Sequence, residues 1–297
     1  MSTLPIENAK KFTDLSVITE APDSAVLLTH DGTGVKQISV SNLKKDVKEL
    51  IDTAQATINA IATTGAGAHN AIYRGKSLGT AVTEAQWAAI KAGTFEDMYI
   101  GDYWTINDVV YRIAAFDYYY RTGDPNTTTH HVTLVPDANM YTHVMNDTNI
   151  TTGAYVGSKM YTEGLTQAKT TINSAFGEAH VLNHRQYLQN ATTDGYASGG
   201  SWYDSTVELM TEQNVYGGKV FGNQLNGTTL PNSYTVDKSQ YPLFTFRPDM
   251  ISNRQWFWLR DVVSTSYFAC ITGPGYAYCG SISSALGVRP AFSIYQS

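Results

Sequence analysis

The chain ends with two rigid-looking blocks, Trp256-Phe-Trp-Leu-Arg-Asp-Val-Val263 and Gly287-Val-Arg-Pro-Ala-Phe292, which frame a segment of different composition. Residues 264–286 between them consist mostly of Ser, Thr, Tyr, Cys, Gly and Ala. From Trp256 to Val288, Arg260 and Asp261 are the only charged residues. A polar, aromatic segment held between two apolar blocks suggests a surface carried by a fixed scaffold.

The side chains of the central segment alternate in character. One set is Cys270, Thr272, Pro274, Tyr276 and Tyr278, and the residues between them are small or apolar. In extended backbone, successive side chains point to opposite faces, so this set is expected to share one exposed face. Tyr, Ser and Thr together give the contact chemistry of binding surfaces. We predict a recognition surface formed by Thr265, Ser266, Tyr267, Cys270, Thr272, Pro274, Tyr276, Tyr278, Cys279, Ser281, Ser283 and Ser284.

The framing blocks are expected to hold this surface in place. Trp256, Trp258 and Phe292, together with Phe268, are predicted to fill the core. Planar guanidinium groups brace carbonyls and carboxylates well, so Arg260 and Arg289 are predicted to lie beneath the surface without contacting a ligand. Cys270 and Cys279 are the only cysteines, and one pair in a chain of this length does not indicate a disulfide framework.

The two blocks resemble the ends of C-type-lectin-fold proteins of phages and bacteria. These include diversity-generating-retroelement variable proteins of the major tropism determinant type, which are receptor-binding proteins. In such proteins adenine-directed randomisation turns an Asn codon into Tyr, Ser, Thr, Cys, Gly, Ala or Pro codons. The expected exposed set falls within these residue types. The resemblance extends upstream to about Phe95, through Gly101-Asp-Tyr-Trp104, Leu134-Val-Pro-Asp137 and Gly153-Ala-Tyr-Val-Gly-Ser158.

Composition limits the other classes. The chain has 297 residues, 15% charged residues, 20 Tyr and 24 Gly, a bias toward strands and turns. Its net charge of −6 disfavours electrostatic binding to nucleic acid. No apolar run is long enough to insert into a membrane. The residues Met1-Ser-Thr-Leu-Pro-Ile-Glu-Asn8 do not match a signal peptide, so release by lysis within a virion is one expected route out of the cell.

Residues 1–40 are expected to form an N-terminal segment that contains a β-hairpin. Two β-rich runs, Ser24-Ala-Val-Leu-Leu-Thr29 and Val35-Lys-Gln-Ile-Ser-Val40, flank a Gly-containing turn. The segment resembles the N-terminal attachment regions of phage tail fibres, which implies contact with tail or baseplate proteins. A small β-ornament on a cytosolic protein remains the alternative.

Residues 41–66 are predicted to form a helix and a Gly-rich joint. Ser41 is the predicted N-cap, and apolar residues follow at heptad-like spacing among charged neighbours: Leu43, Val47, Leu50, Ala54, Ile58 and Ile61. A stripe this narrow is buried most simply by self-association, so a short trimeric coiled coil is expected, with Leu43, Val47, Leu50 and Ala54 at its seam. Docking of the helix on its own C-terminal domain is the alternative. Residues 62–69 are expected to be a flexible joint.

Residues 67–297 are expected to form an α+β domain. Thr83-Glu-Ala-Gln86 is a capping box for a short helix with Trp87 and Ile90 on its apolar face, ending at Gly93. Strands are predicted at 98–100, 103–106, 109–113 and 131–135, and helices at 161–176 and 178–188. This order, followed by late strands, fits a C-type-lectin fold.

Catalytic and metal sites are not expected. His130 and His131 would point to opposite faces of a strand. His180 and His184 have a spacing that zinc sites use, but the Glu that a zincin requires after its first His is missing. The acidic and amide clusters of calcium lectins are not matched, and both cysteines lie in the polar tract rather than in a fixed oxidase setting. Carboxylate pairs for glycoside cleavage cannot be placed from sequence spacing.

These features predict a non-enzymatic phage tail-fibre or baseplate receptor-binding protein, located in the virion and active as a homotrimer. Its partner would be a bacterial cell-surface receptor, either a protein or a glycan, and no cofactor is expected. The alternative is a virion-associated or cellular carbohydrate-processing enzyme of the same fold.

Overall fold

The computed structural model describes residues 22, 24–30, 33–61, 65–222 and 239–297. The chain divides into two compact units, Met1–Thr63 and Thr64–Ser297. Both helices and strands occur in each unit, so the predicted mixed α+β class is confirmed. Most of the predicted attachment segment, residues 1–21, lies outside the described residues.

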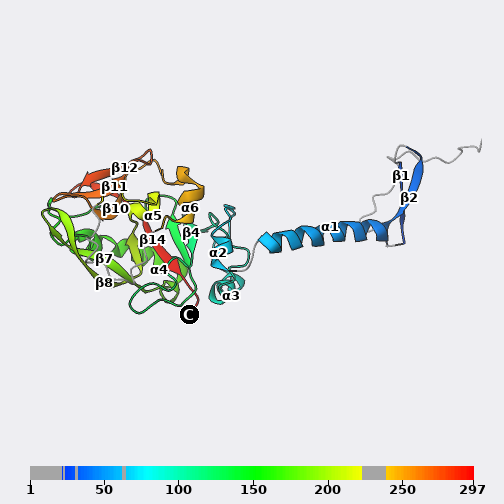
Figure 1. The fold of residues 1–297 in the computed structure, drawn as a ribbon, viewed down its shortest axis with the longest axis horizontal. Helices are drawn as coiled ribbons and strands as arrows, with labels where there is room; N and C mark the ends of the chain where they lie inside the picture. The colour runs from blue at the N-terminus through cyan, green and yellow to red at the C-terminus, as the bar shows by residue number, and fades with distance from the viewer. Residues whose placement is uncertain (1–21, 23, 31–32, 62–64, 223–238) are drawn as a thin grey trace, which may run out of the picture. The chain divides into compact units, whose positions relative to one another are not determined.

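The N-terminal unit begins with the predicted hairpin. Strand β1 (Val26–His30) pairs antiparallel with β2 (Val35–Ser39), in a register that runs from Val26 opposite Ser39 to His30 opposite Val35 (Figure 1). Residues 31–32, at the predicted turn, lie outside the described part of the chain. The hairpin leads directly into a long helix.

Helix α1 (Val40–Ile61) begins one residue after β2 ends. Its N-cap is Ser39, whose Oγ accepts a hydrogen bond from the Asn42 backbone N–H at 3.2 Å. The prediction that Ser41 caps the helix is therefore wrong by two residues, because the helix starts at Val40, before Ser41, and the side chain that accepts an N–H of the first turn is that of Ser39.

The predicted seam of α1 is exposed within the single chain. Leu43 and Val47 are 40% and 47% exposed, Leu50 is 72% exposed, and Ala54 is exposed as well. Ile51 is another exposed apolar residue of α1, at 60% exposure, and it lines the same groove as Leu43 and Val47. It is not among the predicted seam residues. The side chains of Ile58 and Ile61 lie outside the described residues.

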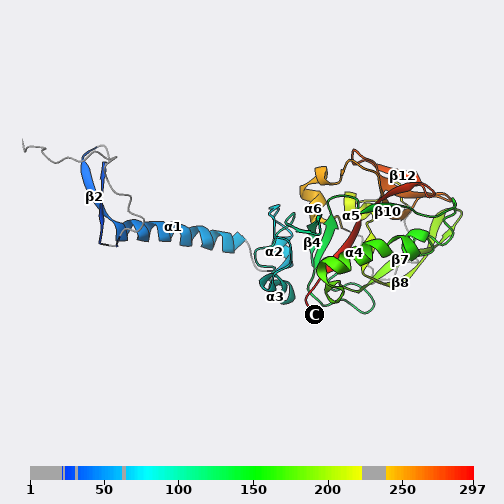
Figure 2. The ribbon, with the colours of Figure 1, turned by 180° about the vertical axis from the view of Figure 1, so that it is seen from behind.

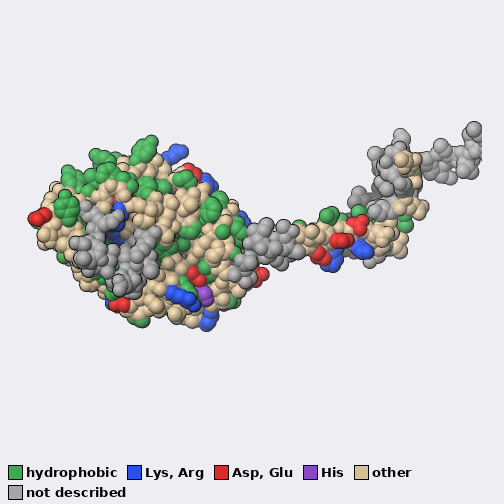
Figure 3. Space-filling view, viewed as in Figure 1, with side chains coloured by type: hydrophobic (Ala, Val, Ile, Leu, Met, Phe, Trp, Pro, Cys, Tyr) green, Lys and Arg blue, Asp and Glu red, His purple; other side chains and the backbone are tan. Residues whose placement is uncertain are grey.

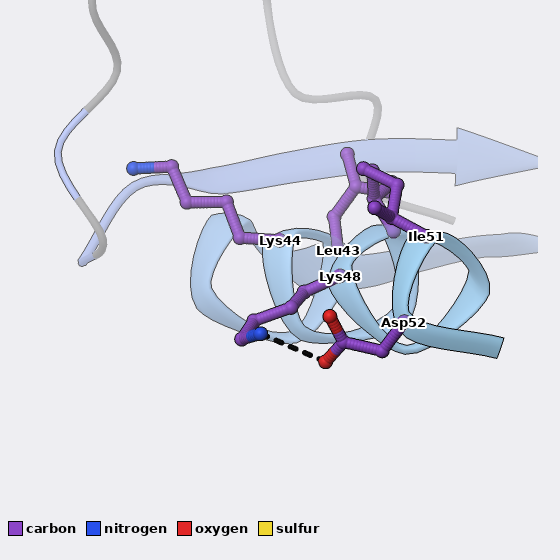
Figure 4. Close-up of a pocket in the computed structure, with 6 residues that line it drawn as sticks. Leu43, Lys44, Lys48, Ile51 and Asp52 are labelled. Carbon is purple, nitrogen blue, oxygen red and sulfur yellow. Dashed lines mark hydrogen bonds and ion pairs between the residues drawn. The ribbon is translucent and has the colours of Figure 1, made fainter. Parts of the chain in front are cut away.

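A groove along α1 joins part of this seam to charged neighbours. Figure 4 shows Leu43 and Ile51 on the same side of the helix, as expected for residues two turns apart. On another side, Lys48 Nζ and Asp52 Oδ2 form an i,i+4 ion pair at 2.7 Å. An apolar strip bordered by such pairs is the pattern of helices that associate with one another.

The C-terminal unit opens with two short helices. Helix α2 (Ala66–His69) follows Gly65 at φ 120°, and His69 is buried with its Nδ1 2.5 Å from the Met98 carbonyl. Residues 66–69 are thus packed into this unit, so the predicted flexible joint does not include them. Residues 62–64 lie outside the described residues.

Helix α3 (Glu84–Ala92) matches its prediction in every part. Thr83 and Gln86 form the capping box, Trp87 and Ile90 are buried, and Gly93 ends the helix in the left-handed conformation at φ 67°. The signals for this helix lie within the eleven residues from Thr83 to Gly93, which is why they could be recognised without the structure.

The first sheet of this unit contains the centre of the core. Its order is β3 (Tyr103–Ile106), β4 (Val109–Phe116), β5 (Val132–Pro136), β14 (Pro290–Ile294) and β9 (Val207–Leu209), with antiparallel neighbours. All residues of β5 and β14 are buried. The predicted turn at Asn107 and Asp108 joins β3 to β4 with both residues at positive φ, the geometry of a tight hairpin.

Helix α4 (Thr166–Phe176) contributes apolar side chains to the core at this sheet. It directs Ala168, Ile172 and Phe176 into the core, and the Phe176 ring lies 5.4 Å from that of Phe292 in β14. Figure 2 shows α4 crossing β14. The predicted helix at 161–176 is confirmed, although its first turn, Met160–Gly164, is π-helical.

The predicted helix at 178–188 is wrong. Glu178–His180 is a single 3-10 turn, and β7 (His184–Thr193) then pairs antiparallel with β8 (Tyr196–Ser205) in a long hairpin. His184, Gln186 and Leu188 are buried and their neighbours are not, which is the period of a strand. The predicted strand at 98–100 is also wrong and contributes one bridge, between Ile100 and Tyr73.

The second sheet is built from the end of the chain. Its order is β12 (Ala277–Ser281), β11 (Tyr267–Ile271), β10 (Phe257–Val262), β13 (Ala285–Val288) and β6 (Tyr141–Val144). Two short helices, α5 (Glu212–Tyr216) and α6 (Pro242–Phe246), complete the described elements of this unit together with the 3-10 turn Pro248–Met250. Within the described ranges, no helix combines the length and the apolar character needed to cross a membrane.

Candidate functional site

The β11–β12 hairpin places aromatic side chains at the surface of the C-terminal unit. Tyr276, in the turn that joins the two strands, is 70% exposed, and Tyr278 of β12 is 49% exposed. Trp256, directly before β10, is 42% exposed, and Phe221 is 41% exposed. These four residues, Phe221, Trp256, Tyr276 and Tyr278, are called the aromatic patch. Figure 3 shows hydrophobic side chains gathered along the edge of the unit that carries β11 and β12.

Ring contacts connect three members of the patch. The Trp256 and Tyr278 rings lie 5.5 Å apart and nearly perpendicular, at 82°. The Phe221 ring lies 6.2 Å from that of Tyr278 on another side, at 61°. Such edge-to-face pairs stabilise each other by about 0.5–1.5 kcal/mol beyond the area that they bury. Tyr278 is therefore held between two neighbours while half of it stays accessible.

Most of the predicted recognition residues are accessible, but two are not. The exposed ones are Thr265, Tyr267, Pro274, Tyr276, Tyr278, Ser283 and Ser284, and Ser266, Cys279 and Ser281 are half-buried. Cys270 is fully buried, and Thr272 is 9% exposed. The prediction that Cys270 and Thr272 belong to an exposed face is wrong.

The reason is that the segment is a hairpin and not one continuous strand. Cys270 pairs across β11–β12 with Tyr278 and across β10–β11 with Trp258, so it lies in the middle of the sheet. A second hydrophobic cluster that includes Trp258 and Phe268 covers it. Burial raises the pKa of the Cys270 thiol to about 12, which leaves it protonated and unreactive at neutral pH. Cys279 is also a free thiol.

The turn that carries Tyr276 is fixed by hydrogen bonds. Within the turn, the Tyr276 backbone N–H donates to Thr272 Oγ1 at 3.1 Å. From outside, Ser252 Oγ donates to the Gly273 carbonyl at 2.7 Å and Tyr216 OH donates to the Gly275 carbonyl at 3.0 Å. Gly275 lies at φ 96°, a conformation that other residues adopt only with strain. The backbone below Tyr276 is therefore preorganised.

Two buried carboxylates fix the loop that carries Phe221. Glu212 in α5 is fully buried and accepts backbone N–H bonds from Val220, Phe221 and Gly222 at 2.8–3.1 Å. Asp261 of β10 accepts the Glu212 backbone N–H at 2.7 Å and pairs with Lys219. A carboxylate that receives several N–H donors ties the loop to the sheet.

Replacing Glu212 by Gln is expected to loosen this loop. The amide is neutral and presents one oxygen where the carboxylate presents two, so all three N–H groups lose a charged acceptor and at least one loses its partner. We expect a loss of about 1.5–3 kcal/mol in the free energy of unfolding, measured by urea denaturation, and faster amide exchange at residues 220–222. The exposed Glu178→Gln should change neither quantity. Unchanged exchange at residues 220–222 in Glu212→Gln would contradict the assignment.

The predicted scaffold residues are buried with one exception. Trp258 and Phe268 lie in the second cluster, and Phe292 lies in the main core. Trp256 is the exception: it precedes the first residue of β10 and belongs to the aromatic patch, so its assignment to the core is wrong. The short alternation Trp256–Phe257–Trp258 gives no signal that the strand begins only at Phe257.

Arg289 braces main-chain carbonyls as predicted, whereas the hydrogen bond of Arg260 described below goes to a side-chain amide. Arg289 is buried and donates to three carbonyls: Pro136 at 2.8 Å, Ile251 at 3.1 Å and Met250 at 3.1 Å. Burial lowers the pKa of its guanidinium to about 10, so it stays charged at neutral pH. Arg260 donates from Nη1 to Gln186 Oε1 at 2.6 Å and thereby joins β10 to β7.

The remaining predicted residues lie at the opposite end of β11. Tyr267 pairs with Ser281, and Ser281 Oγ donates to Asn149 Oδ1 at 2.9 Å. The tip of the β7–β8 hairpin approaches here, since a Cβ on Gly195 would lie 2.4 Å from the Thr265 backbone nitrogen. The exposed Tyr196 belongs to this tip. The recognition set is thus divided between two ends of the sheet.

The histidines singled out in the sequence make packing contacts. His130 Nδ1 lies 2.7 Å from Asp117 Oδ2, and buried His131 accepts the Tyr119 backbone N–H at Nε2. His180 stacks on Trp87, and His184 is buried beside Gln186, so the two do not share a helix face. Among the described residues, no group of three His, Cys, Asp or Glu could hold a metal ion.

No protein-family model, no curated protein and no solved structure matches this chain.

Proposed function

We propose that this protein is a phage tail-fibre or baseplate receptor-binding protein that adsorbs the virion to a bacterial surface receptor. In this proposal the C-terminal unit is a C-type-lectin-fold head, and the β11–β12 hairpin is its binding face. The proposal rests on the resemblance of the framing blocks and on the kind of surface that they carry.

One observation supports the proposal most strongly: exposed aromatic rings stand on an immobilised turn. Tyr276 and Tyr278 are open to solvent, while the carbonyls of Gly273 and Gly275 beneath them are tied to Ser252 and Tyr216. Exposed aromatic residues on a rigid backbone bind with little loss of conformational entropy. Buried arginine bracing below such a surface is the arrangement that recognition by a loop requires.

The N-terminal unit is proposed to assemble and attach the protein. Leu43, Val47, Leu50 and Ala54 are exposed in the single chain, and burying them against other copies removes apolar surface from water. The β1–β2 hairpin would then face tail or baseplate proteins. Three chains are proposed because the segment resembles the stems of fibre tips.

The assembly can be tested on the full chain. We expect light scattering at micromolar concentration to give three times the chain mass of 32.6 kDa. Charged residues at a seam prevent its burial, so Val47→Glu with Leu50→Glu should give a monomer. The control, Lys45→Glu, changes an exposed residue of α1 outside the seam. A monomeric parent, or a dimer, would contradict the proposed trimer.

The proposed function is tested by cell binding. Fluorescently labelled full-length protein is added to a panel of Gram-positive and Gram-negative cells, and bound label is measured together with any sugar released into the medium. The proposal expects saturable binding to some strains and no release. Release of sugar would instead support the carbohydrate-processing alternative, and absence of binding to all strains would contradict receptor recognition.

A further inference from the structure

We propose that the aromatic patch together with Arg254 binds a glycan that carries phosphate or carboxylate groups. This inference rests on the proposed function, because it names the class of receptor that the same site would take. The observations behind it are the exposed guanidinium group of Arg254, the accessible rings of the aromatic patch, and the lack of acidic side chains in the adjoining segments.

Arg254 is an exposed arginine that leads directly into the patch. It lies two residues before Trp256, and its carbonyl packs against the turn, since a Cβ on Gly273 would lie 3.1 Å from it. The Arg254 guanidinium makes no hydrogen bond, ion pair or ring contact with any described residue. A planar guanidinium pairs with phosphate or carboxylate through two parallel hydrogen bonds, so this group is available to an anionic ligand.

Three other arginines at least partly accessible in the same unit are already engaged. Arg247 pairs with Asp249, Arg185 pairs with Asp124 and Asp204, and Arg121 lies over the Tyr120 ring. Arg254 also holds a positive φ of 63°, which costs free energy for a residue other than Gly. The backbone of Arg254 is thus held in an unfavourable conformation at the position whose guanidinium group is exposed.

The charge around Arg254 suits an anion. Residues 252–256 and 272–278 contain no Asp or Glu, although the chain as a whole has a net charge of −6. Glu212 and Asp261, the acidic groups near Phe221, are buried and accept hydrogen bonds within the protein. An anionic ligand at the patch therefore meets Arg254 without an exposed carboxylate from these segments beside it.

The rings supply the second half of the recognition. Sugar rings have apolar C–H faces that pack on aromatic rings, and their hydroxyl groups exchange hydrogen bonds with phenol groups. The hydroxyls of Tyr276 and Tyr278 make no hydrogen bond with a described residue, and the Trp256 ring is accessible beside Tyr278. Accessible rings, phenol groups and an arginine together match a charged polysaccharide.

The first experiment identifies the class of receptor. Cells that bind the labelled full-length protein are treated either with periodate, which cleaves sugar diols, or with proteinase K, which removes surface proteins. We expect periodate to abolish binding and proteinase K to leave it. Glucosylated poly(glycerol phosphate) and polygalacturonate then serve as competitors with phosphate and with carboxylate, and neutral dextran serves as the control. Competition by either charged polymer, and not by dextran, identifies the anionic group.

The second experiment tests Arg254 itself. Arg254→Gln should weaken cell binding about tenfold or more, and Arg254→Lys should recover only part of that loss because an ammonium lacks the planar fork. Raising NaCl from about 0.05 M to about 0.5 M shortens the screening length from roughly 14 Å to roughly 4 Å, so the parent should lose affinity and Arg254→Gln should not. Arg121→Gln removes the same charge from another exposed site and should bind as the parent does.

The outcomes separate this inference from the proposed function. Cells that lose binding after proteinase K but not after periodate have a protein receptor, which overturns the glycan assignment and leaves receptor binding intact. Equal competition by dextran, competition by none of the polymers, or unchanged binding by Arg254→Gln overturns the anionic assignment. Absence of binding to every strain in the panel contradicts the proposed function itself.

Discussion

The double variant Tyr276→Ala, Tyr278→Ala is expected to lose adsorption to cells that bind the parent while it still unfolds cooperatively, with a loss of only about 1–3 kcal/mol from the two ring contacts of Tyr278. Both rings are largely exposed, at 70% and 49%, so their removal leaves no cavity in the core. Exposed anchors at the centre of a binding surface contribute about 2 kcal/mol or more each, and losing both should weaken binding by about a thousandfold. The measurement is the dissociation constant of labelled protein on cells that bind the parent.

Two controls accompany this variant. Tyr196→Ala removes a tyrosine that is 64% exposed on the β7–β8 hairpin, away from the patch, and should bind normally. Tyr276→Phe with Tyr278→Phe keeps the rings and removes the hydroxyls, so it separates packing from hydrogen bonding. Normal adsorption by the double Ala variant would place the recognition surface elsewhere, with the Tyr267 end of the sheet as the next position to test.

The largest expected loss of stability comes from Trp258→Ala. Trp258 is fully buried in the second cluster, and its Nε1 donates to the His143 carbonyl at 2.9 Å. Its ring also fills the space above Gly280, where a Cβ would lie 2.8 Å away. Removing a buried indole costs about 3–5 kcal/mol, measured as the change in the free energy of unfolding in guanidinium chloride.

The neighbouring tryptophan provides a matched control. Trp256 lies two residues earlier and is 42% exposed, so Trp256→Ala should lower the free energy of unfolding by only about 0.5–1.5 kcal/mol, mainly through loss of its ring contact with Tyr278. Trp256→Ala should also weaken cell binding. The main effect of Trp258→Ala should be on the free energy of unfolding. If the two variants were equally destabilised, the assignment of Trp256 to the surface would be wrong.

Elements with local signals could be predicted from the sequence. The capping box and terminal glycine of α3 lie within one short segment, and the apolar spacing of α4 repeats over three turns. The helix predicted at 178–188 failed because β7 is a strand in which buried His184 and Gln186 share the inward face with Leu188. Because polar residues occupy buried positions of β7, its apolar residues do not alternate with a period of two in the sequence. The strand is recognised from its pairing with β8.

The exposed surface proposed for binding could be predicted only in part for a related reason. The exposure of Tyr276 and Tyr278 could be predicted from the polar composition of residues 264–286 and from the alternation of side chains within it. The burial of Cys270 depends instead on Trp258 and on the cluster that covers the sheet. Phe221 joins the surface through contacts that Glu212 makes with three backbone amides. Sequence patterns do not contain such long-range contacts, so Phe221 carried no signal.

The side chains outside the β11–β12 turn that hold it in place donate hydrogen bonds to main-chain carbonyls of the turn. Ser252 and Tyr216, which donate them, lie outside the turn, and the acceptors are the carbonyl oxygens of Gly273 and Gly275. A carbonyl is the same whichever side chain its neighbours carry. Pro274, Tyr276 and Tyr278 can therefore be exchanged without removing these ties, and Thr272 is the turn residue whose own side chain is required. The backbone of this turn is thus held independently of the side chains that it exposes, so a change in the exposed residues leaves these two hydrogen bonds in place.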